Sequence, residues 1–198
     1  MISLFQQSPT LALIVLGLII LSLALHELGH AYAAEISGDP TPKLEGRLSF
    51  NPLVHIDPFG LALIVLVGFG FARPVMTRPA NFKYAWSELL VSSAGILVNL
   101  TIAIICAFFI PRVSGALETV LNVTLLLNCG LVILNALPIP PLDGSHILAA
   151  LLPKNLGNTL RAWSVGSSWM GLVAIVLLQG PIGQLARGLR DILLGWFS

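Results

Sequence analysis

Long apolar runs dominate the chain, and four of them are long enough, or nearly so, to cross a membrane. They cover residues 10–37, 89–110, 119–137 and 163–179. A spanning helix needs about 20 mostly apolar residues. We therefore expect an all-α, polytopic membrane helix bundle with about four spans. No internal repeat or linker interrupts the pattern, so we expect one domain over residues 1–198.

Three shorter segments accompany the expected spans. Residues 59–72 form an apolar run with several glycines, which is short for a span and predicts a re-entrant or tucked hairpin. Residues 142–152 predict a short helix that leaves the third span. The tail, residues 182–197, is amphipathic and has its charged residues on one side, which favours an interfacial helix. The pattern leaves open whether this tail spans the membrane.

The composition supports a membrane protein and excludes several other classes. The chain is 56% hydrophobic and 10% charged, whereas soluble domains carry about 25% charged residues. So little polar surface cannot cover a soluble body. There is no basic tract that would indicate a nucleic-acid partner. Cys106 and Cys129 lie in apolar runs and are expected to be buried residues without a disulfide or metal role.

The distribution of lysine and arginine predicts the orientation. Five of the ten lie between the first two spans, and two more lie between the third and fourth. Arg112 alone lies on the opposite side, while Arg187 and Arg190 in the tail are ambiguous. By the positive-inside rule, residues 38–84 and 138–161 face the cytoplasm, and the N-terminus lies outside.

The chemistry begins at the end of the first span, where the sequence HELGH occupies residues 26–30. His26 and His30 are four residues apart, so on a helix their rings share one face and can reach one zinc ion. Glu27 lies about 100° around the helix. From there it can reach water at the metal and act as a general base. The alternative is a chance HExxH whose polar groups reach the membrane interface.

A third ligand is needed, because a catalytic zinc has three protein ligands and one open position. The sequence NALPIPPLDGSHIL, residues 135–148, carries three prolines that end the third span, and Asp143 follows them. Asp143 is expected on the same cytoplasmic side as HELGH. His26, His30 and Asp143 then form a site of two histidines and one carboxylate. Taken alone, Asp143 also suits a turn or a helix N-cap.

These two motifs together resemble the site-2 protease family of intramembrane zinc metalloproteases of the M50 type. RLSFNPLVHIDPFG, residues 47–60, is similar to a segment of the compact members, and SSAGILVNL, residues 92–100, is a fourth similarity. The resemblance spans most of residues 20–150. It implies a compact member without the PDZ or CBS domains of other branches. Many members carry a helix before the HExxH helix, for which this chain has no room.

The resemblance implies a function in the cell membrane. The enzyme is expected to hydrolyse a peptide bond within or near the cytoplasmic end of a transmembrane substrate helix. Zn²⁺ would be held by His26, His30 and Asp143, and Glu27 would activate water. Asn135 would donate its amide to the carbonyl oxygen that becomes negative. The expected partners are transmembrane protein substrates and the lipid bilayer, and the active site faces the cytoplasmic leaflet.

Several polar residues keep two interpretations. His55 lies in the loop expected on the cytoplasmic side. In a functional interpretation it supports a zinc ligand or positions substrate. In a structural interpretation it bonds Asp57 or backbone. His146 lies one turn after Asp143 and is either near the metal or on a helix surface. Asn99 and Asn128 are amides within spans, for which interhelical hydrogen bonds are expected.

Two other functions compete with the protease. A proteolytically silent membrane scaffold would tolerate loss of His26. A metal transporter would also suit broken helices and polar residues in the membrane, although the sequence shows no inverted repeat. Two imidazoles and a carboxylate can hold divalent metals other than zinc. Substrate identity, regulators and oligomeric state are not determined by the sequence.

Overall fold

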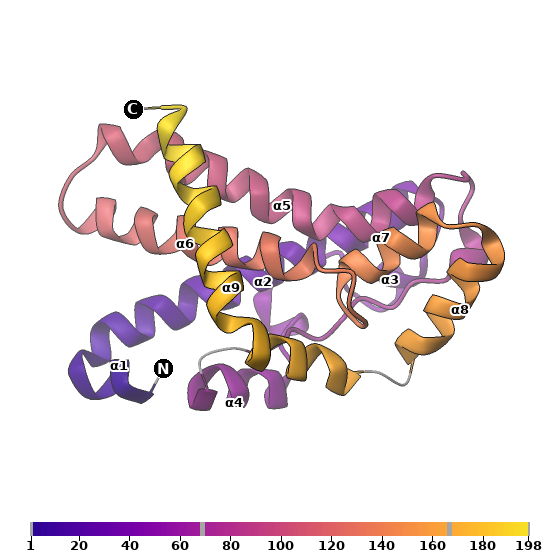
Figure 1. Cartoon of the computed structure of the whole chain (residues 1–198), viewed down its shortest axis with the longest axis horizontal. Coiled ribbons are helices and arrows are strands. Elements are labelled where there is room, and N and C mark those ends of the chain that lie inside the picture. The colour runs from indigo at the N-terminus through magenta and orange to yellow at the C-terminus, as the bar shows by residue number, and fades with distance from the viewer. Residues whose placement is uncertain (1, 68–69, 166–167, 198) are drawn as a thin grey trace. The chain divides into compact units, whose positions relative to one another are not determined.

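The computed structural model describes residues 2–67, 70–165 and 168–197. Within these ranges the elements are helices, with one isolated β-bridge (Figure 1). The all-α prediction is confirmed. The chain forms two compact units, Met1–Lys83 and Tyr84–Ser198. The predicted single domain stays a prediction.

Three helices among the described residues are long and apolar enough to cross a membrane. They are α2 (Pro9–Ile36), α5 (Ser87–Phe109), whose apolar stretch continues to Arg112 through the 3-10 helix η3 (Ile110–Arg112), and α6 (Ala116–Asn135). They match the first three predicted runs to within a few residues. A spanning run is long because it must cross the hydrocarbon core, and it is helical because lipid offers no partner for backbone N–H and C=O groups, which a helix satisfies internally.

The first unit is built on α2. Pro9 occupies its first turn, and the Ser8 hydroxyl accepts a hydrogen bond from the Leu11 amide at 3.4 Å, as is typical of a helix start. A six-residue helix, α1 (Ile2–Gln7), precedes it. Two short helices follow it, α3 (Thr41–Leu44) and the 3-10 helix η1 (Pro52–Val54).

The predicted hairpin of residues 59–72 is a short helix with a return. Helix α4 (Pro58–Val67) has ten residues, and residues 70–72 run back beside its first turn. A Cβ atom on Gly60 would lie 2.0 Å from the Phe71 carbonyl oxygen, and one on Gly70 would lie 2.1 Å from the Gly60 carbonyl oxygen. Only glycine permits this close backbone approach. An antiparallel bridge between Ile56 and Ala72 then closes the hairpin.

The remainder of the first unit is mostly extended. Residues 73–78 are extended, and a 3-10 turn, η2 (Pro79–Asn81), follows them. The Lys83 amide donates to the Ser37 carbonyl oxygen at 2.9 Å. This contact returns the loop to the C-terminal end of α2.

The second unit is a helical bundle in which α5 and α6 pack side by side, with α9 (Ser168–Gly195) across them (Figure 1). Small and medium side chains fill their shared core, as in other membrane bundles. This core contains both cysteines, which are buried as predicted. Its members are Ala103, Cys106, Ala107, Leu125, Cys129, Ala186 and Leu193.

The C-terminal part of the chain differs from the expected division into a fourth span and a separate tail helix. Residues 163–165 end α8 (Lys154–Val165), residues 166 and 167 lie outside the described residues, and α9 begins at Ser168. Helix α9 then continues through Pro181 instead of ending before it. An apolar helix tolerates proline where neighbouring groups satisfy the carbonyl that proline leaves unbonded.

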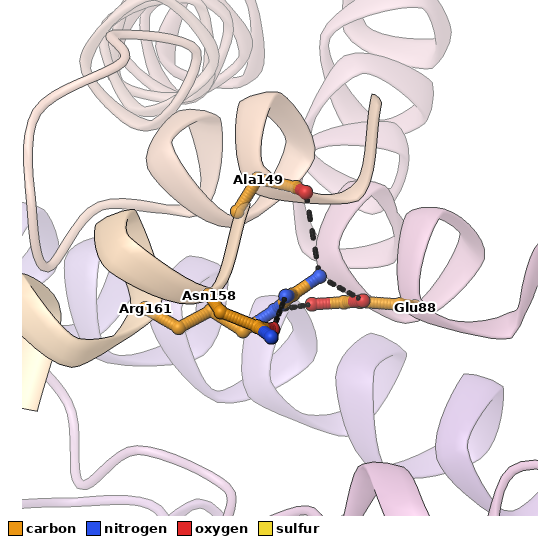
Figure 2. A network of polar contacts seen from close by, with 4 residues as sticks. All are labelled: Glu88, Ala149, Asn158 and Arg161. Carbon is orange, nitrogen blue, oxygen red and sulfur yellow. Dashed lines mark hydrogen bonds and ion pairs between the residues drawn. The ribbon is translucent and has the colours of Figure 1, made fainter. Parts of the chain in front are cut away.

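A polar network fixes α8 within the second unit (Figure 2). The Arg161 guanidinium forms two bonds with the Glu88 carboxylate of α5, at 2.5 and 2.6 Å. It also contacts the Asn158 side chain at 2.8 Å and the Ala149 carbonyl oxygen of α7 (Asp143–Leu151) at 3.3 Å. A two-pronged pair of this kind fixes orientation as well as charge. It therefore joins α5, α7 and α8.

A buried amide pair joins the two spans of the second unit. The Asn99 side-chain amide of α5 donates to the Asn128 side-chain oxygen of α6 at 2.8 Å, and both residues are fully buried. The Asn128 amide donates in turn to the Thr124 carbonyl oxygen at 2.8 Å. The interhelical hydrogen bond expected for these asparagines is therefore present.

We predict that this pair contributes a measurable coupling energy. A double-mutant cycle with Asn99→Ala and Asn128→Ala should give about 0.6–1.7 kcal/mol, the range found for hydrogen bonds between membrane helices. The free energy of unfolding in detergent measures it. Asn122→Ala is the matched control, because the Asn122 side chain bonds its own helix, at the Glu118 carbonyl oxygen. Additive effects in the cycle would contradict the prediction.

Candidate metal centre

The two histidines of HELGH converge on one point. His26 and His30 lie one turn apart on α2 and are 4% and 9% exposed. Their Nε2 atoms are 3.1 Å apart. Two nitrogens that each lie about 2.0–2.1 Å from a tetrahedral zinc are separated by about 3.3–3.4 Å. The pair therefore fits two ligands of one metal ion with a shift of only a few tenths of an ångström.

Glu27 is half-buried and has a partner that the sequence did not reveal. Its Oε2 atom accepts a hydrogen bond from the backbone amide of Val75 at 3.0 Å. The bond joins α2 to the extended segment 73–78, which lies 48 residues further along the chain. A backbone donor on one oxygen fixes the rotation of the carboxylate. The other oxygen keeps its capacity to accept a proton.

A buried arginine holds the same segment. Arg47 is 3% exposed, and its guanidinium donates to the carbonyl oxygens of Val54, Arg73 at 2.6 Å and Pro74 at 2.5 Å. Burial lowers the pKa of Arg47, and the negative charge of Glu27 opposes that lowering. The side chain remains a cation despite its burial, because a guanidinium is not deprotonated in proteins.

Asp39 anchors the far end of the segment. Its side chain accepts hydrogen bonds from the Arg78 amide at 2.6 Å, the Asn81 side chain at 2.8 Å, and the amide and hydroxyl of Thr41 at 3.1 and 2.6 Å. Burial alone would raise the pKa of Asp39, but the four donors outweigh it and hold the pKa below its ordinary value. The buried side chain is therefore a carboxylate at neutral pH.

His55 is bonded to backbone and not to Asp57. It is 1% exposed, and its Nε2 atom lies 2.9 Å from the Ser49 carbonyl oxygen. The His55 carbonyl oxygen accepts from the Arg73 amide at 2.8 Å. Asp57 instead accepts from the Gly60 amide at 2.8 Å. Of the alternatives for His55, the bond to backbone is present, while a role toward metal or substrate stays a prediction.

In the second unit, Asp143 begins helix α7. The N-cap residue is Leu142, so Asp143 is not the N-cap that was one interpretation of it. Its carboxylate lies in the first turn, where the helix dipole favours negative charge. Gly144 fixes the approach of this turn to the end of α6, because a Cβ atom there would lie 2.4 Å from the Ala136 and Leu137 carbonyl oxygens. Glycine after Asp143 is therefore a packing requirement.

Asn135 and His146 lie near Asp143 in sequence. Asn135 ends α6, and its side-chain amide donates to the Leu131 carbonyl oxygen at 3.0 Å. An amide group has two hydrogens, so this bond leaves the predicted donor role open. His146 lies one turn after Asp143 on α7 and is half-buried. Their roles in catalysis stay predictions.

The first unit therefore holds the histidine pair and Glu27, and the second holds Asp143 and Asn135. Sequence reasoning identified these residues but missed Arg47, Asp39 and the Val75 amide as partners of the HELGH region. Aspartate before Pro40 and Thr41 is typical of a turn that accepts backbone donors. The burial of Arg47 has no such local signal, because it depends on carbonyl groups contributed by distant residues.

Comparison with known proteins gives consistent matches. Residues 12–115 and 110–178 match the model of the family described as "Peptidase family M50". The chain is 36% identical over 197 residues to "Putative zinc metalloprotease YwhC" of Bacillus subtilis, covering 91% of this chain and 89% of that protein. No solved structure matches the chain.

Two further relatives are longer than this chain. It is 33% identical over 172 residues to "Putative zinc metalloprotease Rip2" of Mycolicibacterium smegmatis, with 82% of this chain and 65% of that protein covered. It is 27% identical over 170 residues to "Zinc metalloprotease MJ0392" of Methanocaldococcus jannaschii, with 84% and 42% covered.

The lowered pKa of Asp39 predicts a pH-dependent contribution to stability. The folded-state pKa lies below the unfolded value of about 3.9, so the contribution is complete above that value and is lost as pH falls through the folded-state pKa. Asp39→Asn should lower the free energy of unfolding by about 1–3 kcal/mol at neutral pH. The substitution replaces one carboxylate oxygen, which accepts hydrogen bonds, by an NH₂ group, which cannot accept them.

Unfolding measured between pH 7 and pH 3 should show a difference between wild type and Asp39→Asn that is constant at higher pH and narrows as pH falls below about 3.9. Glu45→Gln is the control, because it removes an exposed carboxylate from the same loop. A stability difference that stays constant with pH would contradict this role of the Asp39 charge.

Proposed function

Because the chain belongs to peptidase family M50, we propose that it hydrolyses a peptide bond within or near the cytoplasmic end of a transmembrane substrate helix. The single observation that carries the proposal is the HELGH end of α2. There, two buried imidazoles converge at 3.1 Å beside a carboxylate, on a helix long and apolar enough to cross a membrane.

Family membership confirms several predictions made from the sequence. The resemblance to the site-2 protease family is confirmed, and so is the prediction of a metalloprotease. Zinc as the cofactor follows from the family and from the names of its relatives. The apolar helices support a membrane protein.

We assign the metal to His26, His30 and Asp143. Two neutral imidazoles and a carboxylate form a three-ligand set that leaves one position open, as catalytic zinc requires. Zinc supplies Lewis acidity, which polarises a carbonyl and makes water more acidic. The two histidines meet the geometric requirement by themselves. Asp143 is assigned from its chemistry and from the family motif that it shares.

The protein side chains carry the proton transfers. The Glu27 carboxylate accepts a proton from the attacking water and returns it to the leaving amine. Its Oε2 atom is engaged by the Val75 amide, so Oε1 is the oxygen assigned to the proton. Asn135 donates its amide to the oxygen that becomes negative during attack, an interaction whose loss typically costs about 10²–10³ in rate.

The membrane setting explains the substrate class. At 1.5 Å per residue, the helix from Thr10 to His30 covers about 30 Å, which places HELGH near the far boundary of the hydrocarbon core. The positive-inside rule assigns that boundary to the cytoplasmic leaflet of the cell membrane, with the N-terminus outside. Water enters from the cytoplasm, and a transmembrane protein substrate enters sideways from the bilayer.

A substrate helix must unwind before hydrolysis, and its freed backbone needs a partner. The hairpin over residues 59–72, which the bridge between Ile56 and Ala72 closes, and the loop of residues 38–58 offer an edge against which such a strand can pair. Pairing at this edge is part of the proposal. If substitutions that block this pairing leave cleavage unchanged, pairing at this edge is ruled out.

The decisive experiment compares Glu27→Gln and Asp143→Ala with wild type in detergent. We expect Glu27→Gln to keep one zinc per chain and to lose about 10²–10⁴ in the rate of cleavage of a model transmembrane peptide, the usual contribution of a general base. Asp143→Ala should weaken zinc binding. Glu35→Gln is the matched control, because this glutamate lies two turns along α2 and pairs with the exposed Lys43.

Each alternative function predicts a different result. No zinc in folded wild-type protein, with tolerance of His26→Ala, would support a membrane scaffold. Altered metal flux in vesicles without peptide cleavage would support a transporter. Retained zinc in Asp143→Ala would remove Asp143 from the ligand set.

A further inference from the structure

We infer that Arg47 and Asp39 are positioning residues for Glu27, which they serve by holding residues 73–81 so that the Val75 amide meets the Glu27 carboxylate. The inference rests on the proposed function, in which Glu27 is the general base. Both residues lie outside HELGH and outside the predicted ligand set. They act through the backbone and touch neither metal nor substrate.

The first step is a single peptide group between two opposite charges. The Pro74 carbonyl and the Val75 amide belong to one planar unit. Arg47 donates to its oxygen at 2.5 Å, and Glu27 accepts from its nitrogen at 3.0 Å. Fixing the oxygen fixes the direction of the N–H. The cation and the anion also polarise the peptide in the same sense, which strengthens both bonds.

The second step is the number of bonds that Arg47 makes. Its guanidinium holds the carbonyl oxygens of Arg73 and Pro74 on one side and of Val54 on the other. A planar fork with five N–H donors suits several acceptors at fixed angles, whereas lysine carries one rotating ammonium. Arg47 thereby joins the extended segment to the loop before His55. The segment is held against movement along its own direction.

The third step is the anchor at Asp39, three residues beyond α2. Its carboxylate holds the Arg78 amide and the Asn81 side chain, which bounds the segment at its other end. Gly38 permits this approach with φ of +98°, and a Cβ atom there would lie 2.7 Å from the Lys83 side chain. Asp39 follows directly from the helix that carries HELGH. The Asp39 amide also donates to the Ala34 carbonyl oxygen of α2 at 2.9 Å, so the anchor is fixed to the end of the catalytic helix.

These contacts have a specific catalytic consequence. With Oε2 held, the position of Oε1 and the plane of the Glu27 carboxylate are restricted, so Oε1 meets the attacking water from a defined position. Misplacement of a catalytic group by about 1 Å can cost about 10²-fold in rate. Loss of the bonds by which Arg47 and Asp39 hold residues 73–81 should therefore lower kcat. Zinc content should not change, because none of these bonds involves His26 or His30.

The test uses the full chain and a model transmembrane peptide. Arg47→Gln should lower kcat by about 10²-fold with little change in KM, and Arg47→Lys should restore only part of it. Arg73→Gln is the matched control, because it removes the same charge from an exposed side chain in the same segment. Asp39→Asn should have a smaller effect on kcat, because Arg47 still holds Pro74.

A second pair tests the amide directly and does not depend on the folding of Arg47→Gln. Val75→Pro removes the N–H that Glu27 accepts and should lower kcat with zinc retained. Met76→Pro removes the next amide, which donates to no group in the part of the chain that the structure describes, and should leave kcat near wild type. Hydrogen exchange of residues 71–78 should increase in Arg47→Gln and not in Arg73→Gln, whether or not the enzyme is active.

The outcomes separate the two claims. If the wild type cleaves the peptide and both Arg47→Gln and Val75→Pro keep the wild-type kcat, the positioning role is overturned while the proposed function stands. If Arg73→Gln and Met76→Pro lose as much kcat as Arg47→Gln and Val75→Pro, the effect is a general one on the segment, and the positioning role is also overturned. A wild type that holds zinc but cleaves no peptide overturns the proposed function, and the positioning role falls with it.

Discussion

Charged groups at the end of an apolar helix must be bonded to fixed partners, and this constraint organises the first unit. Glu27 lies within the last ten residues of such a helix, and an unpaired carboxylate there would be costly. The Val75 amide bonds it, and Arg47 bonds the other side of the same peptide group. The long loop after α2 is therefore shaped by what surrounds Glu27, and Asp39 holds its far end.

The second unit meets the same constraint with different pairs. Asn99 and Asn128 satisfy each other between two spans, and Arg161 satisfies Glu88 where α8 meets α5. Asp143 stands at the start of α7, next to a glycine that lets the turn approach α6. In both units, polar groups occur where they fix one element against another. The residues assigned to catalysis lie on elements held in this way.

The sequence predicted α2, α5 and α6 because each is a long apolar run, a signal that depends only on composition along the chain. It also predicted a short helix over residues 142–152, which is α7. The predicted end of the fourth run at residue 179 was wrong, since α9 continues through Pro181. Local rules describe proline in water, whereas its tolerance in an apolar helix depends on neighbours that no local pattern reveals.

By itself, the sequence determined the membrane class, the helical architecture and the residues that belong to HELGH and to the Asp143 motif, because these depend on periodicity and spacing within one segment. Only the tertiary structure decided that the Val75 amide bonds Glu27 and that Arg47 is buried against carbonyl oxygens from three residues. Backbone amides and carbonyls are the same at every position. Which of them meets a buried charge is therefore fixed only when distant segments are brought together.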